Sequence, residues 1–230
     1  MMFRGIDPER SWPVHVVGIT VQPIGSVAAS VLTFPRRNSA ILDIQSRGPK
    51  QIAITFALLC GPDKVQSVLD KLNAWAWGGE GDLQLHADER RSYHAVLQGT
   101  SAADYGIGSQ VTYTFVAPSG IKYGPPIKRP LSTAAIYVGG NTETPLQIAL
   151  TLEQAATRLT WSNGAQHVTL TGDFATGTTI KIDSDREIAT WNGQNAMRFL
   201  TYDSRFFGLQ PGHNQITGPG GHLAYREAWL

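Results

Sequence analysis

The sequence predicts a mainly β protein built from two β-sandwich domains, the first of which carries one α-helix. Three observations lead to this fold class: runs of alternating apolar and polar residues, turn dipeptides between them, and one segment with helical spacing. Alternation with a period of two is typical of half-buried strands in antiparallel sheets. A chain of 230 residues has room for one large domain or two small ones.

Alternating runs predict the strands of the first half. In residues 50–59, Ile52, Ile54 and Phe56 fall on one side of the expected strand. In residues 109–117, apolar side chains alternate with threonines in the same way. The strands expected in this half span residues 14–22, 50–59, 82–87, 92–99 and 109–117.

One segment of the first half has helical rather than alternating spacing. Its apolar residues recur three or four positions apart, at Val65, Val68, Leu69, Leu72, Trp75 and Ala76. Pro62 suits the first turn of a helix, and Gly78-Gly79 suits its end. The pattern therefore predicts one helix over residues 62–77, with its apolar face on a sheet.

Residues 118–146 are rich in proline and glycine and predict the junction between the domains. We place the first domain at 1–134 and the second at 135–230. Strands are expected at 168–174, 178–184, 187–191 and 194–201, with a two-residue turn at Asn192-Gly193 and a candidate for a second at Asn163-Gly164. Pro211-Gly212 fits a type II turn. The last strand, 222–230, either completes the second sandwich or returns to the first domain.

Charge and composition exclude several classes of protein. The 19 Lys and Arg residues balance 18 Asp and Glu residues, so we expect neither nucleic-acid binding nor attraction to anionic membranes. No run approaches the ~18 apolar residues of a membrane span, and the start lacks the apolar region of a secretory signal. We expect synthesis in the cytoplasm without a signal peptide. The single cysteine, Cys60, excludes an intramolecular disulfide.

Residues capable of catalysis or metal binding form no recognisable motif. The run His86–Glu89 lacks the paired histidines of a helical zinc site, and residues 183–187 lack the glycine and terminal glutamate of a calcium loop. Cys60 is interpreted as a small buried side chain rather than a nucleophile. We expect no catalytic residue, no metal and no cofactor. A hydrolase with a dispersed site stays open, and it requires His, Asp or Glu side chains that converge in one pocket.

Four tryptophans are candidate contact residues. Trp161 and Trp191 each lie beside an Asn-Gly dipeptide and could stack on a saccharide or contact a partner, although core packing is the alternative. Trp75 and Trp77 lie two residues apart at the end of the predicted helix, so they cannot face the same way. We expect one of them to pack inside and the other to lie at a contact between subunits.

Three groups of residues, in a fixed order, carry a family resemblance. They are Asp88, Arg91, Tyr93, Ala95 and Gly99; then Gly172, Phe174, Gly177, Ile180, Ile182, Asp183, Arg186, Asn192 and Gly193; then Ser204, Phe206, Leu209, Pro211, Gly212 and Asn214. In this order the segments resemble the distal tail protein (Dit) family of long-tailed, non-contractile bacteriophages. Glu89-Arg90 departs from the family pattern, in which a proline is common at this turn.

The resemblance implies a role at the tip of a virion tail. In that family the first domain is a sandwich of which six copies close into a ring, and the second domain is a galectin-like jelly roll. The ring joins the tail-tube protein to the tail-tip hub protein, and a receptor-binding protein is a further partner. We therefore expect a non-enzymatic structural adaptor that forms a hexamer. The alternative is a lectin-like, carbohydrate-binding module that recognises host cell-wall saccharide.

Overall fold

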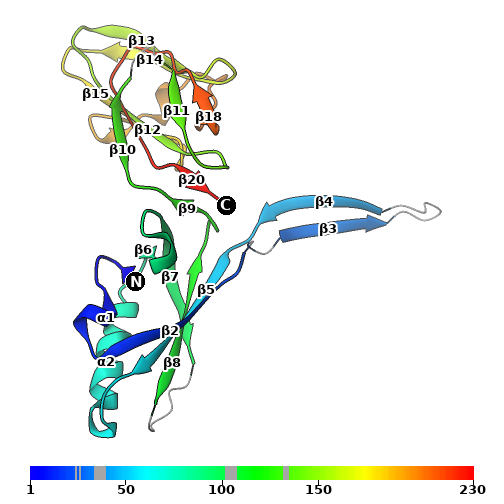
Figure 1. The fold of residues 1–230 in the computed structure, drawn as a ribbon. Helices are drawn as coiled ribbons and strands as arrows, with labels where there is room; N and C mark the ends of the chain where they lie inside the picture. Colours follow the sequence, from blue (N-terminus) through cyan, green and yellow to red (C-terminus); the bar gives the residue numbers. More distant parts are fainter. Residues whose placement is uncertain (24, 26, 34–39, 102–107, 132–134) are drawn as a thin grey trace. The chain divides into compact units, whose positions relative to one another are not determined.

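The computed structural model describes the chain except for residues 24, 26, 34–39, 102–107 and 132–134, and for the strands Val27–Thr33 and Ala40–Arg47 it describes the backbone. The chain divides into two compact units, which are Met1–Tyr123 together with Leu230, and Gly124–Trp229. Strands dominate both units (Figure 1). Among the described residues, no helix is long and apolar enough to cross a membrane.

An antiparallel sheet organises the first unit, with the strand order β1-β6-β7-β8-β5-β2 and with β9 beside β7. These strands are β1 (Met2–Phe3), β2 (Val14–Val21), β5 (Lys50–Leu58), β6 (Gly81–Gln84), β7 (Ser92–Thr100), β8 (Gln110–Ala117) and β9 (Lys122–Tyr123). Strand β7 changes partner along its length: its first half pairs with β6 and its second half pairs with β8. The hairpin of β3 (Val27–Thr33) and β4 (Ala40–Arg47) was not predicted from the sequence.

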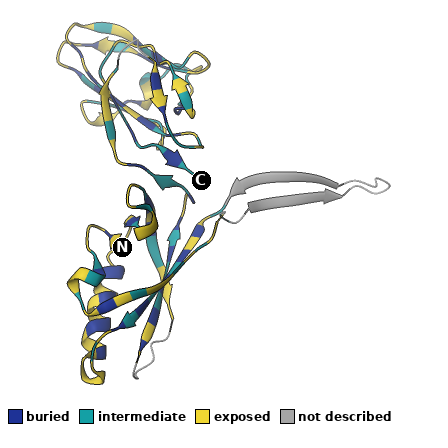
Figure 2. Ribbon diagram, viewed as in Figure 1, coloured by how far each residue is buried: buried dark blue, intermediate teal, exposed yellow. Residues whose placement is uncertain are grey.

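Helix α2 (Val65–Ala76) packs its apolar stripe into the core of the first unit. All six residues of the predicted stripe are buried, and so are Ile52, Ile54 and Phe56 of β5. Figure 2 shows the buried positions alternating along the strands. Burying one such aliphatic or aromatic side chain contributes about 1.5–3 kcal/mol. The helix and the sheet are therefore held together mainly by apolar packing.

The second unit has an antiparallel sheet in the order β10-β19-β12-β15-β16-β17. Its strands are β10 (Ile127–Pro130), β12 (Leu146–Thr151), β15 (Thr179–Asp183), β16 (Ile188–Trp191), β17 (Gln194–Asn195) and β19 (His222–Tyr225). Two strand pairs complete the unit, β13 (Ala156–Ser162) with β14 (His167–Phe174) and β11 (Ile136–Val138) with β18 (Gly212–Asn214). One hydrophobic core joins Ile148 and Ile182 of the sheet to Trp161 and Leu170 of the β13–β14 pair.

Of the two Asn-Gly turns predicted in the second unit, one has the predicted form and the other does not. Asn192 and Gly193 have φ values of +49° and +80°, which confirms the predicted two-residue turn between β16 and β17. The prediction for Asn163-Gly164 is wrong in type, since four residues link β13 and β14. The side-chain oxygen of Asn163 accepts hydrogen bonds from the N–H groups of Ala165 and Gln166, which stabilises the longer loop.

The mainly β, antiparallel fold class with one substantial helix is confirmed. A 3-10 turn (Pro62–Lys64) precedes α2, and one further helical turn, α1 (Pro8–Ser11), was not predicted. The compact units divide between Tyr123 and Gly124, whereas the predicted domain boundary at 134/135 adjoins residues outside the described ones. The single last strand predicted at 222–230 is two strands in the structure. Residues 222–225 form β19, which pairs with β10 and β12 inside the second unit, and Ala228–Trp229 form a separate short strand, β20.

Candidate interaction surfaces

The two tryptophans at the end of α2 face opposite ways. Trp75 is only 5% exposed, whereas the side chain of Trp77 is 81% exposed. The indole N–H of Trp75 donates to the carbonyl of Phe3 at 3.3 Å, so its polar atom is satisfied in the core. Trp77 is the C-cap of the helix, and its backbone N–H bonds to the carbonyl of Asn73. Its ring is thus presented to solvent from the end of a packed helix.

The two tryptophans of the second unit are packing residues. Trp161 is fully buried, and its ring lies so close to Gly218 that a Cβ there would be 2.4 Å from Trp161 Cδ1. A ring without exposed surface cannot stack on a sugar, so that expectation does not hold for Trp161. Trp191 is half-buried, with its ring centroid 4.7 Å from Phe174 and 4.9 Å from Phe199.

The outward face of the second unit's sheet carries two rows of neighbouring side chains. Residues that lie opposite one another in register share a face of the sheet. One row runs through Lys128, Ala224, Gln147, Asp183 and Ile188. The other runs through Pro130, His222, Ala149, Lys181 and Thr190. On β19, β12, β15 and β16 the residues between the rows point the other way, into the core; they are Leu223, Ile148, Ile182 and Ala189.

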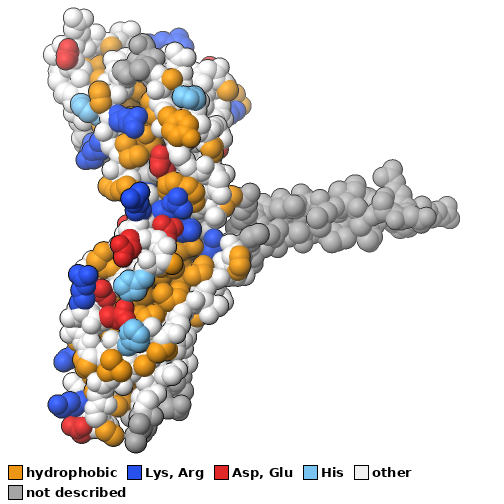
Figure 3. Space-filling view, in the orientation of Figure 1, with side chains coloured by type: hydrophobic (Ala, Val, Ile, Leu, Met, Phe, Trp, Pro, Cys, Tyr) orange, Lys and Arg blue, Asp and Glu red, His pale blue; other side chains and the backbone are white. Residues whose placement is uncertain are grey.

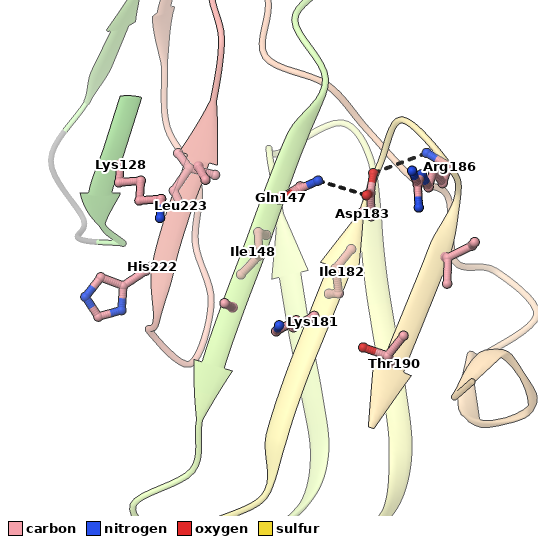
Figure 4. A pocket seen from close by; sticks show the side chains of 13 residues that line it. Lys128, Gln147, Ile148, Lys181, Ile182, Asp183, Arg186, Thr190, His222 and Leu223 are labelled. Atoms are coloured by element: carbon pink, nitrogen blue, oxygen red, sulfur yellow. Dashed lines mark hydrogen bonds between the residues drawn. The ribbon is translucent and has the colours of Figure 1, made fainter. Parts of the chain in front are cut away.

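With the exception of Pro130, the residues of these rows line a hollow of about 740 Å³ (Figure 4). Two short side chains, Ala224 of β19 and Ala149 of β12, lie on the strands between Lys128 of β10 and Lys181 of β15. Lys128 and His222 come from one side of the hollow in Figure 4, and Arg186 from the other. The hollow therefore has a low floor and a basic rim, all of it from residues within the second unit.

Asp183 is the one carboxylate that lines this hollow, and it serves the turn that follows β15. Its Oδ1 accepts hydrogen bonds from the backbone N–H groups of Asp185 at 3.0 Å and Arg186 at 3.2 Å. Its Oδ2 accepts a bond from the side-chain amide of Gln147 at 2.9 Å. Both oxygens are thus engaged, whereas among the described residues Lys128, Lys181 and the Arg186 guanidinium make no ion pair.

A cluster around Glu9 links α1 to the strands of the first unit. Glu9 Oε1 accepts a hydrogen bond from the N–H of Val16 at 3.0 Å and lies 2.9 Å from His15 Nδ1. Glu9 Oε2 lies 2.8 Å from His86 Nε2 and 3.9 Å from the amino group of Met1. Figure 3 shows histidine and acidic side chains next to one another on the first unit.

This cluster predicts a pH-dependent contribution to stability. Burial by itself would raise the pKa of Glu9, but the Val16 N–H bond, the His86 bond and nearby positive charge outweigh it and hold the pKa below its usual value. A carboxyl with a lowered folded pKa stabilises the fold above the unfolded pKa and loses that contribution as the pH falls through the folded value. The first unit of the Glu9→Gln variant should therefore lose less stability between pH 6 and pH 3, measured by urea unfolding, than that of the wild type, which serves as the reference at each pH. Equal losses would contradict a role for Glu9.

The described residues gather no group of three or more His, Cys, Asp or Glu side chains that could hold a metal ion. The hollow brings together only one acid and one imidazole, Asp183 and His222. Cys60 is half-buried and packs against the core of the first unit. Among the described residues, this hollow does not bring together the several His, Asp or Glu side chains that the hydrolase alternative requires.

A comparison with known protein families finds a match within the second unit. Residues 139–229 match the family of siphovirus-type tail components, C-terminal domain. The match covers most of Gly124–Trp229 and confirms the resemblance to phage distal tail proteins predicted from the sequence. No curated protein matches the chain.

Solved structures of phage tail components share the fold. The crystal structure of the SPP1 Dit protein (gp 19.1), a hub of the adsorption apparatus in phages that infect Gram-positive bacteria, is similar with a TM-score of 0.84 and 16% identity. The similarity covers 100% of this chain and 98% of that one. Chains of the phage p2 baseplate in its activated conformation, with Ca and with Sr, have TM-scores of 0.53 and 0.52 at 9% and 10% identity. These cover 95% of this chain and 91% of theirs.

The sequence did not reveal the hollow on the sheet of the second unit. Its rim comes from β10, β15, the turn after β15 and β19, which are up to about a hundred residues apart along the chain. Each basic residue by itself looks like an ordinary solvated side chain. Only the register of the strands places Lys128, Lys181 and His222 on one face.

Proposed function

We propose that the chain is a structural adaptor at the tip of a bacteriophage tail. The observation that carries the proposal is the family match of the second unit together with a fold shared over the whole chain with a phage hub protein. The finer part of the proposal is a ring of six copies that links the tail-tube protein to the tail-tip hub protein, with a receptor-binding protein as a further partner. Its place is the virion tail tip, and its role is structural rather than catalytic.

The composition fits closure into a ring. Charged residues make up 16% of the chain, and the two signs nearly cancel. Charges buried at an interface have to be paired or desolvated, so neutral polar surfaces are easier to bury between copies. Identical head-to-tail contacts that close by rotation also avoid open-ended growth. The chain therefore has a surface composition compatible with several large contacts of this kind.

Mixing experiments test the adaptor. Native mass spectrometry and light scattering should detect a hexamer of the full chain, by itself at high concentration or after addition of the tail-tube or hub protein of the same phage. Ring closure can depend on a partner, so the mixtures are the decisive samples. A chain that stays monomeric in every mixture would overturn the proposal.

Trp77 is the proposed contact residue between subunits. An exposed tryptophan on a rigid helix end offers large apolar area at low entropic cost, and such residues dominate many interfaces. The Trp77→Ala variant should weaken self-association about tenfold or more, measured by analytical ultracentrifugation. The matched control is Leu59→Ala, which removes another exposed apolar side chain of the first unit. Unchanged association of Trp77→Ala would remove Trp77 from the contact.

A further inference from the structure

The hollow on the second unit's sheet has the chemistry of a binding site, and we propose that it binds a polyanionic saccharide. The ligand class is an extended glycan or polyol chain that carries phosphodiester or carboxylate groups. This inference goes beyond the adaptor function, because it concerns one sheet face of one unit and does not require a ring. A volume of about 740 Å³ lies within the range of small-molecule sites, roughly 300–1,000 Å³, and would hold a few sugar units.

The charges of the hollow select an anion. Lys128, Lys181 and Arg186 contribute three cations, and among the described residues no carboxylate pairs with them. Asp183, the only acid among the described residues of the lining, already accepts hydrogen bonds from three N–H groups. An incoming phosphate or carboxylate would thus meet charged donors that have no competing internal partner, which favours short, charge-assisted hydrogen bonds.

The spacing of the cations selects an extended ligand. Strands β10, β19, β12 and β15 follow one another across the sheet, so Lys128 and Lys181 stand three strand spacings apart, about 14 Å. Side chains that stand perpendicular to the sheet keep their ends about this far apart, so two anionic groups along one chain match the two lysines better than a single phosphate does. A chain with repeated negative charges that crosses the strands over Ala149 and Ala224 would reach both, because these short side chains leave the middle of the sheet open.

The lining disfavours two other occupants. Among the described residues it contains no Phe, Tyr or Trp, so a neutral sugar would find no large aromatic ring on which to stack. A polypeptide would bring backbone donors and acceptors that need partners. The central strands offer none, since β19 pairs with β10 and β12, and β15 pairs with β12 and β16. Phosphate and carboxylate oxygens, which accept but do not donate hydrogen bonds, fit the lysine and arginine side chains better.

Titration of the full chain with a fluorescent poly(glycerol phosphate) chain tests the proposal by fluorescence anisotropy, with polygalacturonate as the carboxylate probe. We expect saturable binding to at least one probe and an affinity that falls as salt is added. The Lys128→Gln/Lys181→Gln variant should raise the Kd about five- to tenfold, since two exposed charge contacts are lost. The matched control, Lys64→Gln/Lys71→Gln, removes the same charge from exposed positions at and before α2 and should bind like the wild type.

A second variant tests whether binding depends on the open space of the hollow or on positive charge alone. Ala149→Phe keeps the charge and fills the floor with a side chain suited to an exposed strand position, so it should also weaken binding. Thermal unfolding confirms that each variant is folded. The proposal is overturned if neither probe binds or if the hollow variants bind like the wild type. It is equally overturned if poly-glutamate or neutral dextran binds as tightly as the anionic chains. None of these outcomes bears on ring formation, which is measured separately.

Discussion

Replacing Trp75 with alanine is expected to destabilise the first unit by about 3–5 kcal/mol. The indole of Trp75 is the centre of the aromatic core, with five rings whose centroids lie 5.7–6.5 Å away at steep angles. They belong to Phe3, Trp12, Phe56, Tyr113 and Phe115. Removal leaves a cavity that these rings cannot fill without leaving their own positions, so the loss is larger than the transfer free energy of the indole.

The control lies two residues further along the chain. Trp77→Ala removes the same side chain from an 81% exposed position, so its effect on the free energy of unfolding should stay within about 0.5 kcal/mol. Urea unfolding, with hydrogen exchange to assign the transition to the first unit, measures both variants. Trp75→Phe keeps an aromatic ring but loses the hydrogen bond to Phe3 and should fall between them. A loss for Trp75→Ala no larger than that for Trp77→Ala would mean that the aromatic core does not depend on the indole.

Local periodicity predicted the elements in which buried and exposed positions alternate regularly. In β5 and β8 every second side chain is buried, and in α2 the apolar stripe is unbroken. Residues 194–201 were expected to be one strand, but the structure has a two-residue strand followed by a 3-10 turn at Met197–Phe199. There the side chain of Asn195 accepts a hydrogen bond from the N–H of Met197, a local bond that competes with the strand ladder.

The candidate site depends on information that a single sequence does not carry. Pairing of β12 with β15 and β19, and of β10 with β19, decides which basic residues meet, and these are non-local contacts. The tryptophans illustrate the same limit. Trp161 and Trp191 both follow strand-like runs, yet one is enclosed by Gly218 and the core while the other lies against two phenylalanines. Residue type and spacing single out a tryptophan as a candidate contact residue. Whether its ring is exposed depends on how the surrounding strands pack.

Gly221→Ala should destabilise the second unit by roughly 2–4 kcal/mol, because backbone strain and overpacking add. Gly221 has φ of +106°, a conformation that an L side chain adopts at a high cost. A Cβ at this position would lie 2.5 Å from the carbonyl oxygen of Ala149, which is backbone in a paired strand and cannot turn aside. The carbonyl of Gly221 also accepts the N–H of Leu131 at 2.8 Å, so its own movement would break a bond.

The matched control separates the two causes. Gly164 also has a positive φ, +91°, but a Cβ there would meet nothing within 4 Å, so Gly164→Ala should lose only about 1 kcal/mol from strain. Gly221 directly precedes β19, which supplies His222 and Ala224 to the hollow. Relief of the clash by a shift of β19 away from Ala149 should therefore also weaken binding of the anionic probe, whereas Gly164→Ala should leave it unchanged. Equal losses of unfolding free energy for the two variants would contradict this prediction. They would show that the Ala149 carbonyl of β12 can move away from the added Cβ without loss of stability.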